Sequence, residues 1–233
     1  MAEKRVTRIL CAAEPRGSAD AVERLLDATR DLDVHAIALV GDLGADGDRA
    51  GSYQSVFRAL GQARRPAYWV PGPGDAPIGD YLREAQNMEI VFPFLHGVHG
   101  TAAFASPHVI VAGLGGRVVD DPLSARDEEQ ELAYPRWEAE YRLKLLRELP
   151  EHEVVLLFWT QPAHKGREAG GSDTLAELVN THRPRLVVCG GERGSSTLGR
   201  SLVVAPGSVA DGQYAIADLH ARTVEFEALA ATA

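Results

Sequence analysis

The sequence has few cysteines and no long apolar run. Its 233 residues include two cysteines, Cys11 and Cys189, and each lies in or beside an apolar stretch. Zinc ligands are usually spaced more closely, so we expect two buried thiols. No apolar segment reaches the roughly 18 residues that a membrane-spanning helix needs, and the N-terminus shows no signal-peptide pattern. The sequence therefore predicts a cytoplasmic protein without a membrane partner.

Positive charge is also scarce. The chain has 24 Lys and Arg against 33 Asp and Glu, which gives a formal net charge of -9. Nucleic-acid-binding proteins usually present a basic face, so we expect no nucleic-acid partner. Any anionic ligand must then be held by a local cluster of positive side chains.

Short apolar runs alternate with amphipathic segments at the start of the chain. The runs at 6–13, 34–40 and 66–71 predict buried strands. The segments 20–30 and 53–63 carry apolar residues at helical spacing and predict helices between those strands. This alternation is typical of an α/β fold.

The rest of the chain predicts mostly strands. The expected strands are 90–94, 101–104, 108–113, 154–159, 186–189, 202–204, 213–218 and 223–228. The expected helices are 78–86, 137–149 and 173–181, and the acidic segment 120–131 is either an exposed loop or the lead-in to a helix. The Gly/Ser tracts at 170–172 and 190–196 are too short for linkers and predict tight or functional loops. Together these segments predict one layered α/β domain covering residues 1–233.

Every distinctive motif follows the end of a predicted strand. The motifs are Glu14-Pro15-Arg16-Gly17, Gly41-Asp42, Gly72-Pro73-Gly74-Asp75, Thr160-Gln161-Pro162, Gly190-Gly191-Glu192-Arg193 and Ala205-Pro206-Gly207-Ser208. Ligands of α/β sheets collect beyond the carboxyl ends of the strands. The motif residues are therefore candidates for one shared cleft.

The order and spacing of these motifs resemble the calcineurin-like metallophosphoesterase superfamily. The resemblance runs from Arg8 to about Leu219, and it is strongest to a small bacterial subgroup with altered motifs. It implies two stacked mixed β-sheets flanked by helices, in four layers (α/β/β/α). It also implies hydrolysis of phosphoesters by two metal ions.

Most of the metal ligands of that family are replaced in this chain. Asp42 and Asp75 are retained, whereas Glu14 stands for the Asp of the first block and Gln161 for the late His. The other replacements remove an imidazole or an amide: Arg16 for His, Pro73 for Asn, Gly74 for His, and Gly191 and Arg193 for the two His of the last block.

These replacements argue against a two-metal centre. Such a centre holds its cations about 4 Å apart with several carboxylates and imidazoles, whereas here glycine and proline offer no side-chain donor and arginine repels cations. We therefore expect no metal or other cofactor. The alternative is a single hard cation, Mg²⁺ or Ca²⁺, bound by oxygens of Glu14, Asp42 and Asp75.

The introduced arginines have two interpretations. A guanidinium neutralises leftover carboxylates such as Glu14 and Asp42, and it holds phosphate through its bidentate fork. Either Arg16 and Arg193 have taken over the charge role of the metals, or they form salt bridges in a cleft without a ligand. In both cases we expect at least one arginine within salt-bridge distance of Glu14 or Asp42.

Two further groups are candidates for ligand binding. His164-Lys165 follows Gln161-Pro162 and is suited to binding phosphate or transferring a proton, or it is a solvated loop pair. The tract from Gly190 through Glu192 to Ser196 is rich in Gly and Ser, and such backbone can form a nest for an anion.

Three functions are compatible with these residues. The first is a degenerate phosphoesterase, a pseudoenzyme that binds a small anionic ligand or a protein partner with little or no hydrolysis. The second is a phosphoester hydrolase with one weakly bound hard cation. The third is a scaffold, which includes a homo-oligomer. We expect the first, because a fold does not carry its chemistry once the site residues are gone.

Overall fold

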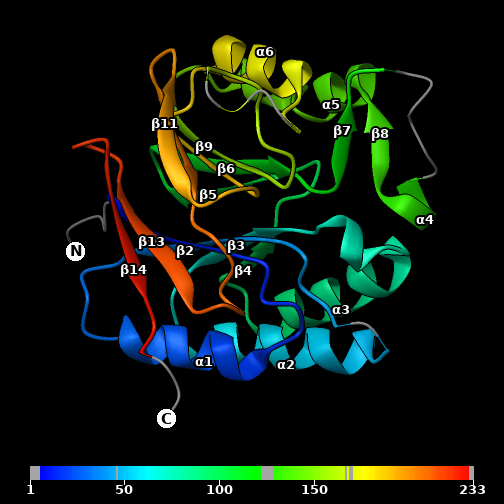
Figure 1. The fold of residues 1–233 in the computed structure, drawn as a ribbon, viewed down its shortest axis with the longest axis vertical. Helices are drawn as coiled ribbons and strands as arrows, with labels where there is room; N and C mark the ends of the chain where they lie inside the picture. Colours follow the sequence, from blue (N-terminus) through cyan, green and yellow to red (C-terminus); the bar gives the residue numbers. More distant parts are fainter. Residues whose placement is uncertain (1–5, 46, 122–127, 166, 168–169, 231–233) are drawn as a thin grey trace.

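The computed structural model describes residues 6–45, 47–121, 128–165, 167 and 170–230, which form two stacked six-stranded sheets between two groups of helices (Figure 1). The first sheet has the order β14-β13-β1-β2-β3-β4. Its strands are β1 (Arg8–Ala13), β2 (Ala36–Val40), β3 (Ala67–Val70), β4 (Leu95–Gly97), β13 (Gln213–Asp218) and β14 (Thr223–Ala228). Strands β1 to β4 run parallel, and β13 and β14 add antiparallel pairs.

The second sheet has the order β11-β12-β10-β9-β6-β5. Its strands are β5 (Ala102–Ser106), β6 (Val109–Leu114), β9 (Glu153–Phe158), β10 (Leu186–Cys189), β11 (Gly194–Leu198) and β12 (Ser201–Ala205). The four central strands are parallel, and β5 and β11 are antiparallel edge strands. Both sheets are therefore mixed.

Helices cover the outer face of each sheet. In Figure 1, α1 (Ala19–Ala28) and α2 (Arg49–Gln62) lie below the first sheet, and α5 (Arg136–Arg142) and α6 (Asp173–His182) lie above the second. The remaining elements are α3 (Ile78–Val91), α4 (Glu128–Glu131), the 3₁₀ turns η1 (Pro73–Asp75) and η3 (Lys144–Glu148), and the parallel pair β7 (Arg117–Val119) and β8 (Ala133–Pro135). None of the described helices is long and apolar enough to cross a bilayer.

Three apolar layers hold the four structural layers together. Along β1, Leu10 and Ala12 pack toward the helices of the first sheet, whereas Ile9, Cys11 and Ala13 pack toward the second sheet. Both faces of the strand are buried, so its sequence is apolar throughout and does not alternate. A third apolar layer joins the second sheet to α5 and α6. The predicted four-layer α/β/β/α fold is confirmed.

Both cysteines are buried and free, as predicted. Cys11 lies between the two sheets, and Cys189 lies between the second sheet and its helices. Burial raises the pKa of each thiol to about 12. Neither is therefore a reactive thiolate at neutral pH.

Some predicted boundaries are wrong. The strand expected at 90–94 does not exist, because α3 runs on to Val91 and the next strand is β4. Ile90 and Val91 are 77% and 62% exposed, so their apolar character does not mark a buried strand. The helix expected at 137–149 is divided into α5 and η3, and the tract 190–196 ends in a strand, β11. Residues 122–127 of the acidic segment lie outside the described residues.

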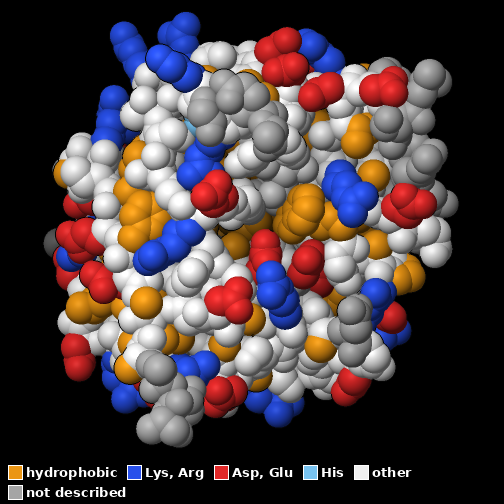
Figure 2. Space-filling view, in the orientation of Figure 1, with side chains coloured by type: hydrophobic (Ala, Val, Ile, Leu, Met, Phe, Trp, Pro, Cys, Tyr) orange, Lys and Arg blue, Asp and Glu red, His pale blue; other side chains and the backbone are white. Residues whose placement is uncertain are grey.

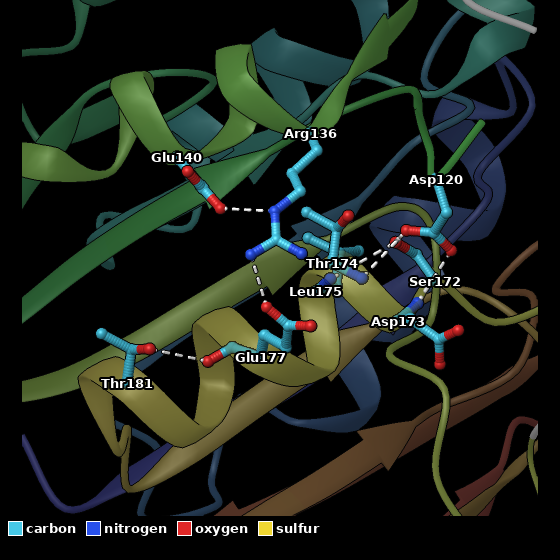
Figure 3. Close-up of polar contacts among 9 residues, drawn as sticks. All are labelled: Asp120, Arg136, Glu140, Ser172, Asp173, Thr174, Leu175, Glu177 and Thr181. Carbon is cyan, nitrogen blue, oxygen red and sulfur yellow. Dashed lines mark hydrogen bonds and ion pairs between the residues drawn. The ribbon is translucent and has the colours of Figure 1, made fainter. Parts of the chain in front are cut away.

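A polar contact at the start of α6 ties this helix to the end of β7. Asp120 follows β7, and its carboxylate accepts hydrogen bonds from Ser172 Oγ, Asp173 N and Thr174 N, each at 2.9 Å (Figure 3). It thus caps unpaired N–H groups of the helix and complements its positive end. Burial acts to raise the pKa of Asp120, but these hydrogen bonds outweigh it and hold the pKa below its usual value.

We predict that Asp120→Ala lowers the free energy of unfolding by about 1 kcal/mol at pH 7, the usual loss for a helix cap. Because the folded-state pKa is depressed, the contribution is fully present above the unfolded-state pKa, which is about 4. It is lost as the pH falls further, through the folded-state pKa. Urea unfolding of both proteins between pH 7 and pH 3 measures this difference, and a difference that grows on acidification would contradict the prediction.

Candidate functional site

A cleft of about 670 Å³ opens where the carboxyl ends of strands from both sheets meet. Its lining residues follow β1, β9 and β10: Glu14, Trp159, Thr160, Gln161, Arg167, Gly170, Gly190, Gly191, Glu192 and Arg193. A second hollow of about 440 Å³ shares Trp159, Thr160 and Gly170 with it and extends to Arg117 and Asp120. In the space-filling view of Figure 2, acidic, basic and apolar side chains are intermixed around the middle of the visible surface.

Backbone hydrogen bonds join the loop after β1 to the loop after β2. Glu14 N donates to Val40 O, Arg16 N donates to Asp42 O, and Gly17 N donates to Leu43 O, at 2.8 to 3.0 Å. Glu14 and Arg16 have φ values of 49° and 48°, a left-handed conformation that is uncommon for residues other than glycine. This backbone track places the Glu14 and Arg16 side chains beside Asp42.

The three charged groups on this wall form one electrostatic unit. Arg16 Nη2 lies 2.5 Å from Glu14 Oε2, within the predicted salt-bridge distance. Asp42 Oδ1 accepts a hydrogen bond from Gly74 N at 2.8 Å. Burial raises the pKa of Asp42, and the Glu14 charge raises it further, whereas the Gly74 N–H and Arg16 act in the opposite direction. Arg16 therefore supplies positive charge to two neighbouring carboxylates.

Asp75 lies behind this wall and does not face the cleft. Its side chain is fully buried and accepts hydrogen bonds from the backbone N–H groups of Leu43, Gly44 and Gly72 at 2.7 to 3.0 Å. Tyr53 Oη donates a further bond at 3.0 Å. These hydrogen bonds use the carboxylate to join the loop after β2 to the turn after β3. The expectation that Asp75 ligates a cation in the cleft does not fit this position.

Burial raises the pKa of Asp75 to about 6, although the backbone N–H groups of Gly44, Gly72 and Leu43 act to lower it. The carboxylate is thus largely ionised at neutral pH. Backbone N–H groups and the Tyr53 hydroxyl stabilise its charge, and none of these hydrogen-bond partners is a basic side chain.

The opposite wall carries two arginines that contact backbone carbonyls. Arg193 Nη2 donates to Glu227 O at 2.9 Å, and its guanidinium lies 5.2 Å from the centre of the Phe226 ring. Arg193 thus borders the cleft but does not pair with Glu14 or Asp42, in contrast to Arg16. Arg167, which sequence reasoning missed, donates from Nη1 to Glu192 O at 2.7 Å.

Gln161 and Gly191 face each other in the cleft. A Cβ atom on Gly191 would lie 2.8 Å from Gln161 Oε1, and the φ of Gly191 is +108°, a conformation that L side chains rarely adopt. Only glycine fits there without a shift of the glutamine. Lys165, a predicted ligand-binding residue, is exposed in the loop beyond Gln161.

Trp159 is the second cleft residue that the sequence did not reveal. It ends the apolar run of β9 and packs partly against the layer between the sheets. Its ring lies close to the Asp42 wall, because a Cβ on Gly72 would clash with Asp42 Oδ1 and would also lie 2.7 Å from Trp159 Nε1. Within the described residues, the buried Nε1 has no hydrogen-bond partner. The position of a tryptophan directly before the Thr160-Gln161 motif was the one available signal.

The four-layer fold and the site at its strand ends match known proteins. The family model of the calcineurin superfamily of metallophosphoesterases matches residues 48–229, and the chain belongs to this family. The crystal structure of TT1561 of Thermus thermophilus is 41% identical, covers 97% of this chain and 100% of that chain, and superposes with a TM-score of 0.90.

Two more distant structures share the fold alone. One is 22% identical with a TM-score of 0.84, covering 96% of this chain and 99% of that chain. The other, described as a novel archaeal phosphodiesterase, is 10% identical with a TM-score of 0.57, covering 95% and 99%. No curated protein matches the chain with significant similarity.

The donor set at the cleft does not suit the pair of metal ions that the family name implies. Glu14 is paired with Arg16, Asp75 faces backbone N–H groups, and Gly191 has no side-chain donor. Among the described residues, no three His, Cys, Asp or Glu side chains come together as a metal-binding group. Transition metals prefer imidazole or several carboxylates, and this wall offers one guanidinium and two carboxylates.

We predict that Asp75→Asn destabilises the protein by about 3 kcal/mol or more, because its NH₂ group would face backbone donors and leave some of them buried without an acceptor. Urea unfolding at pH 7.5 measures the loss. Asp80→Asn, on the surface of α3, is the matched control and should change stability little. Equal stability of the two variants would show that Asp75 does not hold the loops.

Proposed function

We propose that this chain is a degenerate phosphoesterase that binds a small anionic ligand in the cleft and hydrolyses phosphoesters slowly or not at all. The observation that carries the proposal is the contact of Arg16 with Glu14 at 2.5 Å, beside Asp42. In a metal-dependent relative this wall would bind cations. Here a guanidinium provides the positive charge, and the chain holds no tightly bound cofactor.

An anion can compete for Arg16 at low cost. The Arg16 side chain is 55% exposed, so its ion pair with Glu14 is screened by solvent and contributes little to stability. A phosphate oxygen that enters the cleft accepts charge-assisted hydrogen bonds from a guanidinium without first displacing a metal. Arg16 is therefore the solvent-accessible cation of the first wall.

The other wall supplies fixed positive charge. Arg167 and Arg193 line the cleft, and each is held by a backbone carbonyl, which orients the guanidinium. Trp159 also lines the cleft, and its flat indole offers a surface on which a ring can stack. The ligand class that fits is a small phosphorylated or otherwise anionic molecule with a ring or apolar group. A protein partner and a homo-oligomer stay predictions.

One observation favours a second function, a hydrolase with a single hard cation. The Glu14 charge raises the pKa of Asp42, so the two carboxylates are close enough to repel each other. Neighbouring carboxylates supply the oxygen ligands that Mg²⁺ and Ca²⁺ prefer. Arg16 and the cation would compete for the same oxygens.

We predict that phenyl phosphate and inorganic phosphate change the tryptophan fluorescence of the protein, because Trp159 lines the cleft. Trp159→Phe should remove most of this change, and Arg167→Ala should weaken binding about tenfold or more through loss of a charged hydrogen bond. Arg58→Ala, on the exposed side of α2, is the matched control. Two equivalents of bound transition metal together with Mn²⁺-stimulated turnover of p-nitrophenyl phosphate would overturn the proposal.

We predict that Arg16→Ala opens the Glu14–Asp42 wall to a hard cation, since it leaves two neighbouring carboxylates without their counter-charge. Tb³⁺, a Ca²⁺ analogue whose luminescence is sensitised by a nearby tryptophan, should bind the variant more tightly than the wild type. Adding Asp42→Asn should abolish this gain. Tight binding and phosphoester turnover by the wild type would favour the hydrolase, and a gain that survives Asp42→Asn would place the cation elsewhere.

A further inference from the structure

His164 and Ser196 form a side-chain pair outside the acidic wall. His164 lies in the loop after β9, and Ser196 lies on the edge strand β11. His164 Nε2 is 2.5 Å from Ser196 Oγ, and His164 Nδ1 is 2.7 Å from the carbonyl oxygen of Pro162. Both side chains are partly exposed to solvent.

The Pro162 carbonyl fixes the tautomer of His164. A carbonyl oxygen only accepts hydrogen bonds, so the proton of this hydrogen bond is carried by Nδ1. In the neutral ring, Nε2 is then the unprotonated nitrogen, and the Ser196 hydroxyl donates to it. A serine hydroxyl bonded to a histidine that a third group orients is the arrangement of an activated nucleophile.

A positive group lies next to this pair. A Cβ atom on Gly194 would lie 2.5 Å from Arg167 Nη2, so the guanidinium packs directly on the strand at that residue. Gly194 and Ser196 are two residues apart on β11 and share one face of it. The guanidinium can therefore attract a negatively charged group of a molecule bound at Ser196.

We propose that Ser196 is a nucleophile activated by His164, with small anionic carboxylic esters as its substrate class. Ser196 Oγ attacks the ester carbonyl carbon while His164 Nε2 takes the hydroxyl proton. The C–O bond of the ester breaks, the alcohol leaves with that proton, and the acyl group stays on Ser196. Water, deprotonated by His164, then attacks the acyl carbon, which releases the acid and restores the serine.

This activity goes beyond the anionic ligand proposed for the cleft and shares only Arg167 with it. The reaction at Ser196 does not require Glu14, Asp42 or a cation. A protein that binds no phosphate should still react at Ser196, and a protein that binds phosphate but does not react there refutes this inference alone.

The test is covalent labelling of the whole chain with diisopropyl fluorophosphate, in which Ser196 Oγ displaces fluoride from phosphorus. Peptide mass spectrometry gives the rate at each serine, with the exposed neighbour Ser195 as the internal reference. Two histidine variants separate base from structure. His164→Asn keeps a donor near Pro162 and lacks Nε2, whereas His164→Gln keeps a polar group near Ser196 but cannot take up its proton.

We expect labelling of Ser196 to exceed that of Ser195 by about 100-fold and to fall to the Ser195 rate in both histidine variants, since a general base contributes about that much. The thermal midpoints of the variants report whether the loop is intact. Ser196→Ala should also remove a one-equivalent burst of p-nitrophenolate from p-nitrophenyl acetate. Equal rates at the two serines, or labelling that either folded histidine variant leaves unchanged, would overturn the proposal.

Discussion

The buried carboxylate of Asp75 is the interaction on which the cleft depends. An ionised group that has left water must be surrounded by donors, and here these are three backbone N–H groups and the Tyr53 hydroxyl. To supply them, the loop after β2 and the η1 turn after β3 must both curl around one point. The shape of the loop after β2 sets the position of the Asp42 side chain. Backbone hydrogen bonds then hold the loop after β1 against the loop after β2.

The two walls of the cleft handle charge differently. On the first wall, the half-exposed Arg16 guanidinium lies between the acidic side chains of Glu14 and Asp211. On the second wall, Arg167 and Arg193 are tethered to peptide carbonyls, which carry only a partial charge. Tethering to a dipole fixes the direction of a guanidinium while leaving most of its charge uncompensated, and this suits anion binding.

The fold was predictable because it follows from local patterns. Strands buried on both faces are apolar throughout, as in β1, and the motifs at their ends gave both the family resemblance and Glu14, Gln161 and Glu192 in the cleft. What failed depends on contacts distant in sequence. Arg193 donates to Glu227 O on β14, an edge strand of the first sheet, and nothing in the Gly-Gly-Glu-Arg motif encodes that contact. Asp75 ends a motif that predicts a cleft residue, but its carboxylate is buried against the backbone of Leu43 and Gly44.

Two glycines near the cleft also limit which side chains could be introduced there. The family resemblance implies an imidazole at position 74, yet a Cβ there would lie 2.8 Å from Asp42 Cγ. It implies another at position 191, and a Cβ there meets Gln161 in a backbone conformation that histidine rarely adopts. A larger side chain at either position therefore requires a neighbouring side chain to move. A single substitution at either position is therefore not enough to place an imidazole in the cleft.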